Sequence, residues 1–114
     1  MAIHHAEPAE VIDISPLGTK LTDTQTTTLI KTDCVEVIRL VLPAGKEIRR
    51  HYVPGEITVQ CLEGNVAFST VKSQCELAAG NLLYLNGGDD HALRSVEDST
   101  LLVTILLRNK QPKT

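Results

Sequence analysis

Two glycine-framed windows decide the fold of this chain: GKEIRRHYVPGEITVQCLEG at residues 45–64 and GNLLYLNGGDDHALRS at residues 80–95. Each window places one histidine, His51 or His91, at a set distance from glycines that suit turns. Apolar and polar residues alternate over residues 57–62, which is typical of a β-strand with one buried face. The windows therefore predict two strand-and-turn units of a small β-barrel, each bringing a histidine to one pocket.

The rest of the chain also reads as short β-strands separated by turns. No stretch keeps apolar residues at helical spacing for three turns. Strands are predicted at residues 11–14, 26–31, 34–42, 57–62, 66–71, 75–77, 82–85, 91–96 and 100–107. About nine evenly spaced strands without a linker predict one all-β domain, a sandwich or barrel, over residues 1–114. We expect roughly the first ten and last six residues to be peripheral, with residues 109–114 frayed.

The strand predicted at residues 100–107 is apolar on both faces. Such a strand lies either in the centre of a sheet or against a second subunit. Both alternatives stay open from the sequence.

Composition argues against two classes of partner. The net charge is −3 and no basic stripe is present to neutralise phosphates, so nucleic acid is not expected. The longest apolar run, at residues 101–107, is far shorter than the ~20 residues that span a bilayer. The N-terminus lacks the basic and apolar regions of a signal peptide.

The three cysteines, Cys34, Cys61 and Cys75, are odd in number and widely spaced. They form neither a disulfide framework nor a C-x-x-C motif. We expect buried, reduced thiols and hence a cytoplasmic protein.

The two windows resemble the paired motifs of the cupin superfamily, G-x5-H-x-H-x3,4-E-x6-G and G-x5-P-x-G-x2-H-x3-N. The positions in register are Gly45, His51, Gly64, Gly80, Gly88 and His91, with Asn86 at the proline place and Ser95 at the asparagine place. The resemblance covers residues 45–95 and implies a double-stranded β-helix, or jelly roll. Family habit, together with the doubly apolar closing strand, implies a homodimer.

The departures from the family pattern concern its metal. The resemblance implies ligation by both histidines and the glutamate of the first motif and by the histidine of the second. Here Val53 occupies the second histidine place and Ile57 the carboxylate place, so only His51 and His91 remain. Catalytic sites normally supply three protein ligands. No cofactor is assigned with certainty, and a divalent transition metal (zinc, iron, manganese or nickel) is the alternative.

Glu56 is a candidate third ligand. In the family register Ile57 and every second residue after it face the pocket, and Glu56 faces away. A β-bulge at Pro54–Gly55 would slip the pattern by one and turn Glu56 inward. The apolar residues suit a core-facing strand, so we favour the family register and an apolar pocket wall.

Two functions remain open. The first is a small-molecule-binding protein with a weakened or absent metal site, whose ligand contacts His51, His91, Val53 and Ile57. Arg49, two residues before His51, would point to the same side of an extended strand and could bind a carboxylate.

The alternative is a metal-dependent cupin enzyme, such as a dioxygenase, isomerase or decarboxylase. His51 and His91, with Glu56 or water, would hold the ion, which acts as a Lewis acid or activates oxygen. A weaker third possibility is metal-free catalysis with one histidine as the base. No residue pattern identifies the catalytic group.

Overall fold

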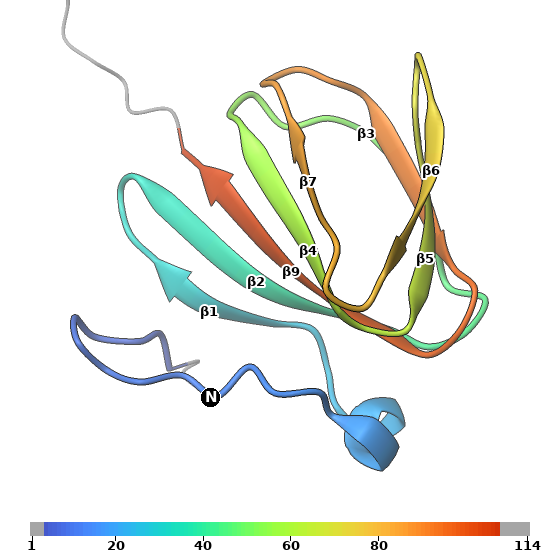
Figure 1. Ribbon diagram of the computed structural model, residues 1–114. Helices are drawn as coiled ribbons and strands as arrows, with labels where there is room; N and C mark the ends of the chain where they lie inside the picture. Colours follow the sequence, from blue (N-terminus) through green and yellow to red (C-terminus); the bar gives the residue numbers. More distant parts are fainter. Residues whose placement is uncertain (1–3, 108–114) are drawn as a thin grey trace, which may run out of the picture.

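The computed structural model describes residues 4–107 as two antiparallel β-sheets that face each other (Figure 1). The five-stranded sheet has the order β1 (Thr27–Lys31), β2 (Val35–Leu42), β9 (Ser99–Leu106), β4 (Ile57–Glu63) and β7 (Leu82–Leu85). The four-stranded sheet has the order β3 (Glu47–His51), β8 (His91–Ser95), β5 (Asn65–Thr70) and β6 (Gln74–Ala78). The predicted all-β jelly roll is confirmed.

The core lies between the two sheets because alternate residues of each strand point inward. On β4, Ile57, Val59 and Cys61 are buried, whereas the residues between them are half-buried. Phe68 on β5 meets them from the other sheet. Each fully buried aliphatic side chain contributes about 1.5–3 kcal/mol, so a one-residue slip of β4 would forfeit several such terms.

Strand β9 lies in the centre of the five-stranded sheet, between β2 and β4. It pairs with β2 over its whole length and with β4 over most of it. The first of the two alternatives for this doubly apolar strand is therefore correct.

The predicted strand at residues 11–14 is wrong. This segment has no regular structure, and Val11 is 92% exposed. The carboxylate of Asp13 accepts hydrogen bonds from the amide and the hydroxyl of Ser15, at 2.9 and 2.6 Å. Such local bonds compete with a strand ladder. The ninth strand is instead β3, inside the first window.

The sequence pattern also missed a short 3-10 helix, η1 (Gly18–Asp23). The carboxylate of Glu63 accepts hydrogen bonds from the amides of Leu17 and Gly18, at 2.8 and 3.0 Å, and so holds the helix start. No helix within residues 4–107 is long and apolar enough to cross a membrane. Residues 109–114, predicted to fray, lie outside the described residues.

The prediction of three buried cysteines is right only for Cys61. Cys34 and Cys75 are exposed. Cys34 lies in the turn before β2, and Cys75 lies on the edge strand β6. The apolar residues beside each of these cysteines in the sequence therefore do not bury the thiol.

Two motif glycines have positive φ but different surroundings. Gly64, between β4 and β5, has φ +91°, and a Cβ there would collide with the Ser99 hydroxyl and the Asp98 carbonyl. Gly80, before β7, has φ +90°, but a Cβ there would meet nothing within 4 Å.

We expect Gly80→Ala to lower the free energy of unfolding by about 1–2 kcal/mol, the cost of left-handed backbone for an L-residue. Gly64→Ala adds a collision with backbone and should cost about 3–5 kcal/mol. Urea denaturation of both variants measures the two losses. Equal losses would show that the β4–β5 turn is not packed as described.

Candidate functional site

A cavity of about 170 Å³ lies between the sheets. It brings together four of the predicted site residues: His51, His91, Val53 and Ile57. The other lining side chains are all hydrocarbon: Ile38, Leu40, Ile48, Val59, Phe68, Leu93, Val103 and Ile105.

The two histidines are neighbours across the β3–β8 pair. His51 ends β3, His91 begins β8, and they occupy paired positions of the ladder. Their ring centres are 4.3 Å apart and the planes are tilted by 58°. His91 is only 5% exposed and stacks on Phe68 at 5.6 Å, whereas His51 is exposed. The sequence did not single out Phe68, although its place in an alternating strand predicts an inward side chain.

A β-bulge sits in β3, before His51, and not at Pro54–Gly55. The pairing passes from Ile48–Leu93 to His51–His91, so two residues of β3 oppose the single residue Ala92. The bulge lets Ile48 and His51, three residues apart, line the same cavity.

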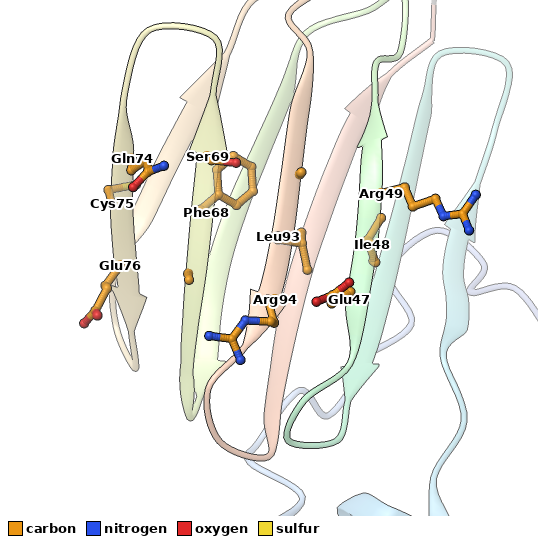
Figure 2. A pocket seen from close by; sticks show the side chains of 12 residues that line it. Glu47, Ile48, Arg49, Phe68, Ser69, Gln74, Cys75, Glu76, Leu93 and Arg94 are labelled. Atoms are coloured by element: carbon orange, nitrogen blue, oxygen red, sulfur yellow. The ribbon is translucent and has the colours of Figure 1, made fainter.

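The bulge also corrects the expectation for Arg49. Arg49 does not line the cavity with His51; it lines a groove of about 540 Å³ on the four-stranded sheet (Figure 2). In Figure 2 its guanidinium extends away from Glu47 and Arg94. On a regular strand Arg49 and His51 would share a face, and the extra residue breaks that relation.

Main-chain carbonyls fix the tautomer of both rings. Nδ1 of His51 lies 2.9 Å from the carbonyl oxygen of Arg49, and Nδ1 of His91 lies 3.1 Å from that of Asp89. A carbonyl oxygen can only accept, so Nδ1 carries the hydrogen and Nε2 of the neutral ring carries a lone pair. Neither Nε2 atom has a hydrogen-bond partner among residues 4–107.

The environment keeps His91 uncharged. Burial lowers its pKa below the ordinary 6.5, and the charges of His51 and Arg50 act in the same direction. The hydrogen bond to the Asp89 carbonyl and the charge of Asp90 oppose the shift without cancelling it. At neutral pH His91 is therefore an acceptor at Nε2.

Glu56 does not line the cavity, and the family register of β4 is correct. The Glu56 carboxylate accepts a hydrogen bond from the Tyr84 hydroxyl at 2.9 Å, and this bond raises the pKa of Tyr84. Ile57 points into the core instead, 4% exposed. The alternative that slips β4 and turns Glu56 toward the histidines is wrong. No group of three or more His, Cys, Asp or Glu side chains in residues 4–107 could hold a metal ion.

The loops beside the histidines lie in close backbone contact. Gly88 donates its amide hydrogen to the Val53 carbonyl at 2.8 Å, and a Cβ on Gly87 would collide with the Pro54 carbonyl. Asp89 shapes this turn by accepting a hydrogen bond from the Asn86 amide at 3.0 Å.

Comparison with known proteins identifies the fold. No protein-family profile and no curated protein matches the sequence. A solved structure of a conserved protein of unknown function from Streptococcus pyogenes is 25% identical, with a TM-score of 0.71, covering 100% of this chain and 97% of that one. A cupin superfamily protein from Desulfitobacterium hafniense is 14% identical, with a TM-score of 0.74 and coverage of 90% and 100%.

An RmlC-like cupin protein from Desulfovibrio desulfuricans is 22% identical, with a TM-score of 0.65 and coverage of 93% and 96%. Likeness at these identities carries the fold and not an activity. Two facing sheets, two glycine-framed histidine windows and these matches lead to one conclusion: the chain has the cupin fold, a double-stranded β-helix.

Proposed function

We propose that this protein binds a small, largely apolar molecule in the cavity between its sheets, without a tightly held metal. The observation that carries the proposal is the identity of the residues at the family's ligand places. Val53 and Ile57 line the cavity there with hydrocarbon, and Glu56 is engaged by Tyr84 instead.

The size of the cavity suits a ligand of one ring. A dry apolar cavity of ~150 Å³ is enough to bind benzene. A ligand that buries about 150 Å² of apolar surface gains about 4 kcal/mol, which corresponds to a dissociation constant near 1 mM. Hydrogen bonds to the histidines would add to this affinity.

A metal-dependent enzyme remains the second candidate, and one observation favours it. Metal-binding histidines usually donate their other ring N–H to a carbonyl or carboxylate, which orients the ligating nitrogen. His51 and His91 are both held in this way, by the carbonyls of Arg49 and Asp89. Two imidazoles fit a divalent ion only with solvent or substrate as further ligands, and such an ion would supply Lewis-acid chemistry.

We expect the protein purified without chelator to hold far less than one transition-metal ion per chain by elemental analysis. Val53→His with Ile57→Glu restores the four-ligand set and should give a thermal midpoint that rises with added zinc or nickel. The parent with the same metals is the control. If the buried glutamate prevents the double variant from folding, Val53→His alone still provides three histidines and can be tested in its place. One metal per chain in the parent, lost in His51→Ala and His91→Ala, would establish the enzyme candidate instead.

Stability should fall on acidification because of His91. Its folded pKa is lowered below the ordinary value of 6.5, so the unfolded chain binds more protons between those two values. The stability that neutral His91 contributes is full above about pH 6.5 and is lost as the pH falls through the lowered pKa. Denaturation at pH 8 and pH 5 should show that the free energy of unfolding falls less between these two pH values in His91→Gln than in the parent. His5→Gln, in the N-terminal segment, should keep the parent's loss, and an unchanged loss in His91→Gln would contradict the assignment.

We also propose that the chain forms a homodimer through the outer face of the five-stranded sheet. One row across that face reads Tyr84, Thr58, Thr104, Val37 and Ile30. The next row reads Leu82, Gln60, Leu102, Arg39 and Thr27.

Charge supports a second copy as the partner for this face. Arg39 is the only charged side chain in the two rows, and its guanidinium donates to the Asp13 carbonyl. At the β7 edge Leu82 and Tyr84 are 65% and 55% exposed. A two-fold interface sets one patch against itself, so two rows with a single charged side chain bring few like charges together between two chains of net charge −3.

Thr104→Arg places a charge in the middle of this face and should convert a dimer to a monomer in light scattering. Gln74→Arg, on the edge of the other sheet, is the matched control and should stay dimeric. A parent that is monomeric at 50 μM or so, well above the Kd of a typical specific interface, or a dimeric Thr104→Arg, would refute the proposed interface.

A further inference from the structure

The cavity offers two hydrogen-bond acceptors and no side-chain donor. Its lining consists of two histidines and ten hydrocarbon side chains. Each histidine has already committed its one N–H to a main-chain carbonyl. What the side chains present to a ligand is therefore two lone pairs, on Nε2 of His51 and Nε2 of His91.

We infer that the cavity selects an uncharged ligand that donates a hydrogen bond, such as a phenol, over a carboxylate of the same size. The inference rests on the binding function proposed above and adds the chemical class of the ligand. It follows from the direction of the two Nδ1 hydrogen bonds.

The acceptors can be reached. His91 is 5% exposed as a residue, but its Nε2 atom keeps some accessible surface. Among residues 4–107, only Arg39 Nε and Asn65 Oδ1 are side-chain polar atoms that are both sealed from solvent and without a hydrogen-bond partner. Nε2 of His51 belongs to an exposed side chain. With ring centres 4.3 Å apart, the two rings border the same small space. A hydroxyl in that space would meet an acceptor.

A carboxylate lacks a partner there. Burying an ionised carboxylate is costly unless a cation or donors meet it. Of the nearby arginines, Arg49 lines the outer groove, and Arg50 reaches 3.5 Å from the Ser69 hydroxyl on β5 without lining the cavity. A carboxylate would face two lone pairs and hydrocarbon walls.

The test compares three probes of one-ring size: phenol, toluene and benzoate. Amide chemical-shift titrations at pH 8, well above the lowered pKa of His91, give each dissociation constant. We expect phenol to bind about 5- to 10-fold more tightly than toluene, the ratio that one net hydrogen bond supplies. Benzoate should bind more weakly than toluene.

Two variants separate the acceptor from the cavity. His91→Phe and His51→Phe each keep a ring and remove an acceptor, so phenol should lose most of its advantage over toluene in one of them or in the double variant, while toluene binding persists. The exposed position of His51 keeps the test usable if the buried substitution prevents folding. Arg49→Gln, outside the cavity, should leave all three constants unchanged.

The outcomes are distinguishable. Benzoate binding as tightly as phenol, or a phenol advantage that survives when both histidines are replaced by phenylalanine, overturns the inference and leaves the cavity as an apolar site. Failure of all three probes to bind at about 5 mM, several times the expected dissociation constant, overturns the proposed function itself.

Discussion

The inward face of β4 is the constraint on which the rest of this molecule depends. Ile57, Val59 and Cys61 are buried against the opposite sheet, and strand geometry then sends Glu56 to the other side. The same alternation that builds the core thus removes the carboxylate from the cavity. The packing of the core therefore also decides that Ile57, and not Glu56, lines the cavity.

Much of the fold was predictable because it rests on period-two alternation and on glycines at turns. Eight of the predicted runs became strands within a residue or two of their bounds, and Ile57 lies on the inward, buried face of β4. The segment at residues 11–14 has the same local appearance as a strand. It differs because no strand pairs with it and because the Asp13 carboxylate accepts a hydrogen bond from Ser15 instead. The alternation of apolar and polar residues reveals neither of these facts.

The β3 bulge was beyond sequence reasoning for a similar reason. A bulge is a relation between two strands, two residues opposite one, so the sequence of either strand alone does not specify it. Its effect on the site is large, since it takes Arg49 out of the cavity while keeping Ile48 and His51 in it. The tautomers of the two histidines likewise depend on where the carbonyls of Arg49 and Asp89 point.

Those carbonyl anchors bear on how such a pocket can change over evolutionary time. Every residue has a main-chain carbonyl, so replacing the side chain of Arg49 or Asp89 leaves the hydrogen-bond partner of each histidine in place. The hydrogen bonds that orient the two rings therefore tolerate side-chain replacement at both positions, whereas several residues of the hydrocarbon walls are also part of the core between the sheets. An orientation that rests on main-chain atoms is inherited with the course of the backbone and not with the identity of the neighbouring side chains.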